Sequence, residues 1–517
     1  MARTNALRAL AARVDTASLR RDFDTGGVRD DKDVLEGRQS QGAGAGSATG
    51  TGGESAFSVA RTADRAFLVF NPLAYPRTEV IEVKLWDTQL NLDHLVVSGE
   101  GMVPQRVQVL EKGHYWGHDF VTVAFPVDIP ALGYRAVCVS DRLLELGMQP
   151  ASPGDAWAGM WGDWRTELPP DYSLENDVLK VMLDSSSGGL VSLVDKRTGR
   201  EWVPEGSLLG ALEYCVEAGN QMSAWVIGEF VRRDLVRGGT LRRVHTGPYV
   251  NTWRWTGRVN QTTLELDITL HQGMPRVDFR LRVDWREMGT PGETPHLRVQ
   301  FPLALEHPQA RYEIPYGSLV RDFRNGEEVV AQRWADVARA DGTGATLVNT
   351  SRYGHSLDGD TLALTLLRAT THPDPLPDLG EHVIEYALLP HGAGWTVGDA
   401  MQAGESFNAP LTATSCGFQT GALPSTLSLV AVETANVRLT VLKQGEDGAG
   451  MVLRLVEVEG RDTEACVTLA PVLLNGVTSA CEVDTLERPL AENGAQLDGR
   501  SVTVTVPAFG IVTVKLS

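Results

Sequence analysis

The chain has 517 residues, which is enough for about three domains with buried cores of their own. Its 66 acidic residues outnumber its 47 lysines and arginines and give a formal net charge of −19. This acidic balance argues against nucleic acid or an anionic membrane as the main partner, because both require a basic surface, and it suits a neutral ligand.

The N-terminal residues and the cysteines bear on the compartment. No apolar run approaches the roughly 18–20 residues that span a bilayer, and the N-terminus lacks the apolar core of a signal peptide. Its Arg/Ala-rich start slightly resembles a transit peptide, although Asp15 follows closely. The five cysteines are widely spaced and form no Cys-x-x-Cys pair. We expect reduced, mostly buried thiols in a cytoplasmic protein, with a vacuolar or organellar location as the alternative.

The first 56 residues contain one predicted helix and one predicted linker. Leu7, Leu10 and Val14 share one face of a short helix over residues 4–14, within a helical segment 1–36. Such a helix must dock on this chain or on another one, because it cannot bury its apolar face alone. Residues 37–56 are rich in glycine and serine and predict a flexible linker.

From about residue 66 the apolar pattern has a period of two, which predicts half-buried strands. Residues 264–270 and 277–285 predict a hairpin in which Glu265 and Asp267 face Arg280 and Arg282. No helix of ten or more residues is expected after residue 66. The fold class is therefore mainly β, built from several antiparallel sandwiches.

Three sandwiches are expected along the chain: a small one over 57–150, a large one over 151–410 and a C-terminal one over 411–517. Clusters of proline and glycine near 149–154, 169–170 and 409–424 are the candidate boundaries.

Common catalytic motifs are missing. The sequence contains no phosphate-binding loop, no G-x-G-x-x-G before a helix, no H-E-x-x-H and no G-x-S-x-G. Paired carboxylates for glycoside hydrolysis cannot be identified from spacing, because many carboxylates alternate along the predicted strands.

A cluster of histidines and aspartates over residues 372–391 has two interpretations. Its members, His372, Asp374, Asp378, His382 and His391, are residue types that bind divalent metals. The prolines at 373, 375 and 377 hold the segment extended, which favours a rigid loop whose carboxylates cap backbone groups.

Two further segments have the composition of a sugar site. Residues 349–356 (NTSRYGHS) combine hydrogen-bond donors with an aromatic ring, as sugar sites do, or they form a hairpin loop that satisfies its own polar groups. Tryptophans at 157, 161, 164, 253 and 255 are either a stacking platform or core residues, and core packing is favoured.

These segments together resemble glycoside hydrolase family 38, the α-mannosidases. Residues 68–80 (LVFNPLAYPRTEV) are similar to the strand that opens the C-terminal half of that family. Glu175-Asn176 and residues 189–201 (GLVSLVDKRTGRE) are similar to its D-K-x-T-G-R-E hairpin. Shorter matches follow in the family's order up to the C-terminus, so that the resemblance covers residues 60–517.

The resemblance implies a C-terminal β-domain half that includes a galactose-mutarotase-like supersandwich. In the family an N-terminal barrel carries the aspartate nucleophile and the zinc ligands, and this chain is expected to begin inside the helical bundle that follows the barrel. No catalytic residue and no metal ligand is therefore assigned here, and zinc is expected in the parent enzyme's catalytic domain. Five loop positions are the candidates to line the substrate site: Arg352, Tyr353, His355, Asp374 and Trp225.

Two functional interpretations remain open. The chain is the C-terminal portion of an α-mannosidase-like hydrolase, whose partners are an α-mannoside or oligosaccharide and a catalytic barrel from the same gene or a split subunit. Alternatively, it is a free-standing, non-catalytic carbohydrate-binding or scaffold protein. Epimerase-like chemistry is a weaker third idea, and it requires a His/Glu pair across one concave sheet face.

Overall fold

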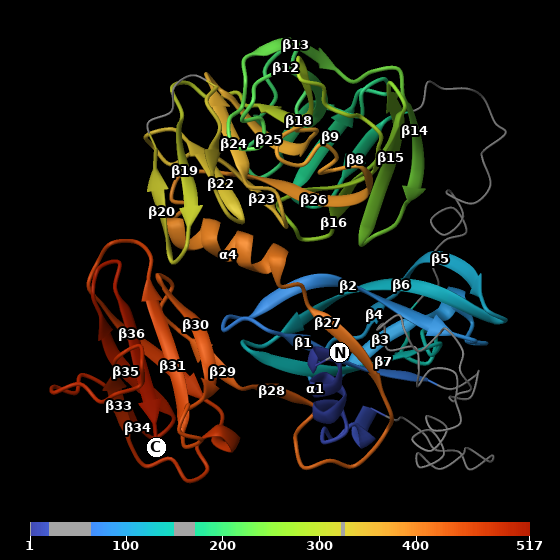
Figure 1. Cartoon of the computed structure of the whole chain (residues 1–517). Coiled ribbons are helices and arrows are strands. Elements are labelled where there is room, and N and C mark those ends of the chain that lie inside the picture. The colour runs from blue at the N-terminus through green and yellow to red at the C-terminus, as the bar shows by residue number, and fades with distance from the viewer. Residues whose placement is uncertain (1, 20–63, 149–170, 322–325) are drawn as a thin grey trace. The chain divides into compact units, whose positions relative to one another are not determined.

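The structure is a computed structural model that describes residues 2–19, 64–148, 171–321 and 326–517 (Figure 1). The chain divides into unit 1, residues 1–157 with 409–517, and unit 2, residues 158–408. The predicted linker 37–56, the tryptophans at 157, 161 and 164, and the boundary clusters at 149–154 and 169–170 lie outside the described residues. All strand pairs between the described strands are antiparallel, and the mainly β prediction is confirmed.

The first sandwich of unit 1 packs a three-stranded sheet, β2-β6-β5, against a sheet in the order β27-β1-β7-β3-β4. Alternate residues of its strands form the core between the sheets, as the pattern of Ile81, Val83 and Leu85 predicts. The strands are β1 Arg65–Asn71, β2 Arg77–Trp86, β3 Val96–Gly99, β4 Gln105–Arg106, β5 Gln108–Tyr115, β6 His118–Ile129, β7 Gly133–Ser140 and β27 Thr412–Cys416.

The expected start of the C-terminal sandwich at residue 411 is wrong. Strand β27 pairs with β1, and β28 (Thr426–Ser428) pairs with β7, so both complete the first sandwich. Strand β27 covers the edge of β1, and β28 covers the part of β7 that β3 leaves unpaired, so that neither exposes free backbone groups.

The predicted N-terminal helix is present as α1 (Ala2–Ala11) and docks on this chain. Ala11, Val14 and Leu19 are buried against Leu68 and Tyr134 of the first sandwich. The backbone N–H of Asp15 donates to the carbonyl of Leu423 at 2.7 Å. The apolar face of the helix therefore packs on the first sandwich of the same chain, and the residues after the helix are bonded to a segment about 400 positions later in the sequence.

The second sandwich of unit 1 has the sheets β29-β32-β35-β34 and β30-β31-β36-β33, and the core lies between them. The alternating apolar residues near the C-terminus lie on its strands β35 and β36. The strands are β29 Val430–Val432, β30 Val437–Gln444, β31 Met451–Glu457, β32 Thr463–Leu469, β33 Ala480–Val483, β34 Gln496–Asp498, β35 Ser501–Val506 and β36 Ile511–Leu516.

Unit 2 is a large sandwich of a nine-stranded and a six-stranded sheet, with a four-stranded sheet, β11-β10-β9-β8, that adds to the same core (Figure 1). The nine-stranded sheet has β14 Thr240–His245, β15 Val250–Val259, β16 Thr262–His271, β17 Val277–Trp285, β26 Gly380–His391, β23 Gly344–Asn349, β22 Trp334–Ala338, β19 Gln309–Ile314 and β20 Gly317–Val320 in this order. The six-stranded sheet has β13 Phe230–Leu235, β12 Ala211–Ala218, β18 Glu293–Pro302, β25 Thr361–Arg368, β24 Gly354–Asp358 and β21 Val329–Val330. The small sheet has β11 Arg200–Glu201, β10 Leu190–Asp195, β9 Leu179–Leu183 and β8 Ser173–Glu175.

The predicted hairpin is present as β16 and β17, and the register of its charges is confirmed. Glu265 lies opposite Arg282, and Asp267 lies opposite Arg280. Arg282 reaches Glu265 at 2.5 Å, whereas Arg280 turns to Glu385 at 3.2 Å. Trp253 and Trp255 of the adjacent strand β15 are buried in the core, as favoured.

The expectation of no later helix is wrong, because residues Val397–Asn408 form the helix α4. Thr396 and Asp399 cap its first turn: the Thr396 hydroxyl donates to the Asp399 carboxylate at 2.9 Å and accepts from the Asp399 N–H at 3.2 Å. Gly404 is needed for packing, since an added Cβ would lie 2.8 Å from the ring of Trp334. Two glycines in a twelve-residue helix lower its propensity and conceal it in the sequence.

None of the five cysteines forms a disulfide, and all five lie in the described residues. Cys138 and Cys215 are buried, and the other three are half-buried, which is less burial than expected. Among the described helices none is long and apolar enough to cross a membrane.

Candidate functional site

Three loops meet at one end of the large sandwich in unit 2, and we call residues 219–229, 350–353 and 369–379 the loop surface. The first loop joins β12 to β13, the second joins β23 to β24, and the third joins β25 to β26. Ser223 ties the first loop to the third: its buried hydroxyl accepts the backbone N–H groups of Thr371 and His372, both at 3.0 Å. The N–H of Ala224 also donates to the carbonyl of His372 at 3.1 Å.

A buried ionic network beneath the loop surface fixes the first loop. Glu217 on β12 is fully buried, and its carboxylate accepts from Arg368 Nε at 2.6 Å, from His296 Nδ1 at 2.9 Å and from the Gly228 N–H at 2.8 Å. The guanidinium of Arg368 also donates to the carbonyls of Ser223 and Val226. Burial alone raises the pKa of Glu217, but the hydrogen bonds from Arg368 and His296 outweigh it and hold that pKa at about 2.

The second loop is held by Asn349 and by the third loop. The buried side chain of Asn349 accepts from the Arg352 N–H at 2.7 Å. Asp378 accepts from the Arg368 N–H at 3.0 Å and attracts the Arg352 guanidinium. Burial nevertheless lowers the pKa of Arg352. These contacts place Arg352 beside the third loop.

Two exposed aromatic rings are the main features that the loop surface offers to a ligand. Trp225 is 63% exposed and Tyr353 is 55% exposed. Trp225 lies beside the ring of His372, with 6.1 Å between centroids. Asp374 is exposed on the third loop, where its carboxylate caps the Leu376 N–H at 2.9 Å. Aromatic faces flanked by planar polar groups have the chemistry that binds neutral sugars.

His355 differs from the other four predicted site residues. It lies in strand β24 rather than in a loop, and its ring is fully buried against Tyr312, with 6.4 Å between centroids. Its Nδ1 donates to the Tyr353 carbonyl at 3.2 Å, and burial lowers its pKa to about 4. The prediction that His355 is a loop residue lining the site is therefore wrong, because alternation along β24 turns it into the core.

The histidines and aspartates of residues 372–391 make the contacts expected of a rigid loop with capping carboxylates, not those of a metal site. His382 Nε2 lies 2.7 Å from the Asp378 carbonyl, and His391 pairs with Asp336 at 2.9 Å. Asp374 and Asp378 bind backbone N–H groups, as capping carboxylates do. Within the described ranges no three His, Cys, Asp or Glu side chains come together as a metal site.

The His/Glu pair that epimerase-like chemistry requires is present as His296 and Glu217, but it is closed to a substrate. Both side chains have zero exposure. The two Glu217 oxygens are engaged by Arg368, His296 and Gly228, and His296 Nε2 lies 2.9 Å from the Thr365 hydroxyl. The pair supports a loop instead of facing a sugar.

Sequence reasoning did not identify Glu217, His296 or Arg368 as a unit. A signal exists in β12, where Glu213, Cys215 and Glu217 alternate with core residues. Strand β18 repeats this signal, since His296 and Arg298 alternate with Leu297 and Val299. In these two strands one face is apolar and the other is charged, and both faces are buried. This pattern indicates a buried layer of ion pairs, but it does not show which charged residues pair with each other.

The D-K-x-T-G-R-E hairpin, the most specific motif of the sequence, has a structural role. Asp195 is buried and binds Arg197 through both the backbone and the guanidinium. Glu201 accepts the N–H groups of Leu193, Trp202 and Val203 at 2.8–3.0 Å. Burial alone raises the pKa of Glu201, but these bonds and the Ser192 hydroxyl hold it below its usual range.

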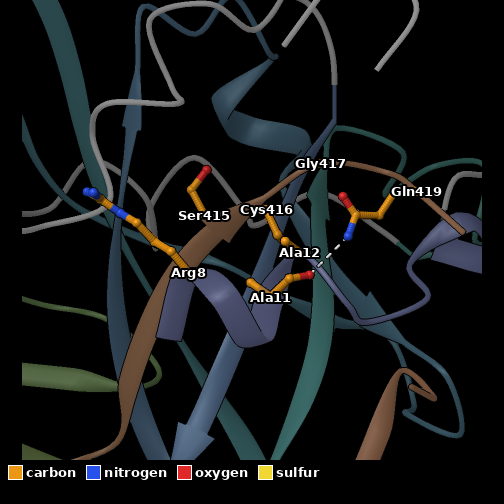
Figure 2. A pocket seen from close by; sticks show the side chains of 7 residues that line it. All are labelled: Arg8, Ala11, Ala12, Ser415, Cys416, Gly417 and Gln419. Carbon is orange, nitrogen blue, oxygen red and sulfur yellow. Dashed lines mark hydrogen bonds between the residues drawn. The ribbon is translucent and has the colours of Figure 1, made fainter. Parts of the chain in front are cut away.

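Unit 1 has a hollow between α1 and β27 (Figure 2). Figure 2 shows the Gln419 amide turned toward the Ala11 carbonyl, to which it donates at 3.0 Å, and Arg8 pointing away from them. Small side chains and backbone line most of this hollow, so we interpret it as the seam where the helix docks.

Two family profiles match the chain. The profile described as "Glycosyl hydrolases family 38 C-terminal domain" matches residues 174–376, and the one described as "Glycosyl hydrolases family 38 C-terminal beta sandwich domain" matches residues 436–514. Together they span more than half of the chain, and the first includes most of the loop surface.

Curated relatives and solved structures agree with these profiles. Alpha-mannosidase 2C1 of Homo sapiens is 30% identical over 405 residues, which are 75% of this chain and 37% of the relative. The Mus musculus protein of the same name is 31% identical over 350 residues, 65% of this chain and 32% of the relative. An alpha-mannosidase from Enterococcus faecalis V583 shares the fold, with a TM-score of 0.71, 14% identity and coverage of 99% of this chain and 58% of that one. The chain spans about a third of the length of these curated relatives.

Proposed function

The chain belongs to glycoside hydrolase family 38, whose C-terminal domains it carries, and from this premise we propose that it is the β-sandwich portion of an α-mannosidase-like glycoside hydrolase. The loop surface of unit 2 borders the sugar site of a catalytic domain, which comes from the same gene or from a separate subunit. The substrate is an α-mannoside or a mannose-containing oligosaccharide.

One observation carries this proposal. A fully buried carboxylate, Glu217, and the guanidinium of Arg368 hold the loop that exposes Trp225, although burying an ion pair is costly. This free-energy cost has a function if the ion pair holds the Trp225 ring in one fixed position, because binding sites depend on pre-positioned groups. Trp225, Tyr353, Arg352 and Asp374 supply the aromatic and polar contacts of a neutral sugar.

Hydrolysis itself is assigned to the catalytic domain. A retaining mechanism needs an aspartate nucleophile, a second carboxylic acid and, in this family, zinc. The described residues offer no donor set that fits zinc, so this chain's own contribution is to bind and orient the sugar.

The alternative function is that of a free-standing, non-catalytic carbohydrate-binding or scaffold protein. The exposed Trp225 supports it equally, because a sugar-binding surface requires no nucleophile. Both functions remain compatible with an acidic chain and a neutral ligand.

The first test is an assay of the isolated chain with 4-nitrophenyl α-mannoside, together with a zinc determination by mass spectrometry. We expect no turnover above background and no stoichiometric zinc. Turnover with bound zinc would contradict the assignment of catalysis to another domain.

The second test adds a separately expressed family 38 catalytic domain to the chain. We expect the wild-type chain to raise mannosidase activity, and Trp225→Ala and Tyr353→Ala to raise KM by about tenfold, which corresponds to about 1.4 kcal/mol. Val472→Ala, an exposed apolar residue of unit 1, is the matched control. Saturable mannoside binding without any effect on the catalytic domain would favour the scaffold alternative.

A further inference from the structure

The β5–β6 hairpin of unit 1 ends in two exposed aromatic residues, and we call His114–Asp119 the hairpin tip. Tyr115 closes β5, Trp116 and Gly117 form the turn, and His118 opens β6. Trp116 is 73% exposed and Tyr115 is 38% exposed. Burial in the chain therefore does not account for the tryptophan.

Backbone preference does not account for it either. Trp116 has φ +48° and Gly117 has φ +79°, the left-handed pair of a two-residue hairpin turn. Asn-Gly and Asp-Gly are favoured in such turns, because a left-handed backbone strains most side chains. A bulky ring in this strained conformation is exposed to solvent, so neither the turn nor the core requires it. We infer that the ring is kept for a contact with a ligand outside the chain.

Two His–Asp pairs hold the tip rigid. His114 Nδ1 donates to Asp119 at 2.8 Å, and the ring's Nε2 accepts the Gly117 N–H at 3.2 Å. His118 lies 2.6 Å from the carboxylate of Asp87, which also accepts the Asp119 N–H at 3.1 Å. The tip is thus pre-organised, which lowers the entropy lost on binding.

From this geometry we propose that the hairpin tip is a binding site for neutral pyranose sugars. The Trp116 ring stacks on the apolar face of the sugar. Asp119, whose side chain is 84% exposed, supplies acceptor oxygens for the sugar's hydroxyl groups, and His114 holds this carboxylate in place.

The chemistry of the tip favours a sugar over other ligands. Two carboxylates within hydrogen-bonding distance of its histidines oppose a phosphate-rich or otherwise anionic ligand. The tip presents two aromatic residues among polar ones, whereas stable protein interfaces need a much larger complementary surface. It belongs to unit 1, whereas the loop surface belongs to unit 2.

The test uses the full chain with mannotriose, maltotriose and cellotriose, followed by saturation-transfer NMR and calorimetry. We expect at least one trisaccharide to bind, and Trp116→Asn to weaken it at least about tenfold. Asparagine tolerates the left-handed turn, so this variant keeps the hairpin. Phe509→Asn is the matched control, because Phe509 is 63% exposed with φ +53° on another turn.

The possible results separate this site from the loop surface. If no trisaccharide binds, or if Trp116→Asn binds as tightly as the wild type, the proposal is overturned. Binding that Trp225→Ala removes and Trp116→Asn retains also overturns it, and leaves the proposed function intact. Self-association that Trp116→Asn abolishes, without sugar binding, would assign the tip to a protein interface instead.

Discussion

The chain contains the same chemical pair, a histidine with a carboxylate, in two opposite environments. His296 and Glu217 lie under the loop surface with zero exposure, whereas His114 and Asp119 lie on the hairpin tip and are mostly exposed. The His–carboxylate distances are nearly equal, 2.9 Å and 2.8 Å. The His–carboxylate distance alone therefore does not distinguish a pair that supports the fold from a pair that can bind a ligand.

Burial makes the difference between these pairs. Every Glu217 oxygen is already engaged by the protein, because an unpaired buried charge would be too costly. Asp119 keeps most of its surface in water and can exchange it for a ligand. The buried pair is thus a fixed support, and the exposed pair is available for recognition.

The largest expected effect comes from breaking the buried pair. Glu217→Gln leaves the Arg368 guanidinium, which is only 13% exposed, without its counter-charge and weakens the support of the Trp225 loop. We expect a loss of about 3–5 kcal/mol in the free energy of unfolding of unit 2, measured by urea denaturation.

Glu175→Gln is the control for that measurement. Glu175 binds Lys196 at 2.6 Å, but its side chain is 48% exposed, so we expect a loss below about 1 kcal/mol. Equal losses for the two variants would show that burial does not distinguish the pairs.

The folding elements were predictable to very different degrees. Strands with one buried face, such as Val277–Trp285, show alternation directly, because a period of two places every second side chain in the core. Helix α4 is not predicted, because Gly398 and Gly404 lower its helical propensity, and Gly404 is required by the close approach of the Trp334 ring. The sequence pattern therefore predicts an element when the burial of its own side chains sets that pattern, and fails when packing against another element decides its residues.

The candidate site was predictable only in its exposed parts. Trp225, Arg352, Tyr353 and Asp374 follow from composition and resemblance, and the structure brings their loops together. Glu217 and Arg368 are 151 positions apart, and no spacing rule connects them. Pairing within a buried ionic layer depends on strand order, which single-strand patterns do not contain.

An intermediate effect is expected for His355, a buried histidine without a carboxylate. Burial lowers its pKa from 6.5 to about 4, so between these values the unfolded chain binds more protons than the folded chain. Stability is therefore lost as the pH falls from 6.5 to 4, by about 3 kcal/mol. His355→Leu should remove this loss and keep most of the stability at pH 7.

Urea denaturation at several pH values measures this effect. His307→Asn is the control, since His307 is exposed and its left-handed φ of +49° suits asparagine. If His355→Leu loses stability on acidification as steeply as the wild type, the buried imidazole is not the source.

The smallest effect is expected at the exposed pair. Asp119→Asn removes the charge beside His114 but retains the shape of the turn, and an exposed pair contributes less than about 1 kcal/mol. Asp87→Asn is the graded comparison: the Asp87 side chain is only 14% exposed and binds both His118 and the Asp119 N–H, so we expect about 1–3 kcal/mol. Thermal unfolding of unit 1 measures both. A loss at Asp119 as large as that at Asp87 would make the tip pair a structural support like Glu217 and His296, whereas a negligible loss leaves its carboxylate available for a ligand.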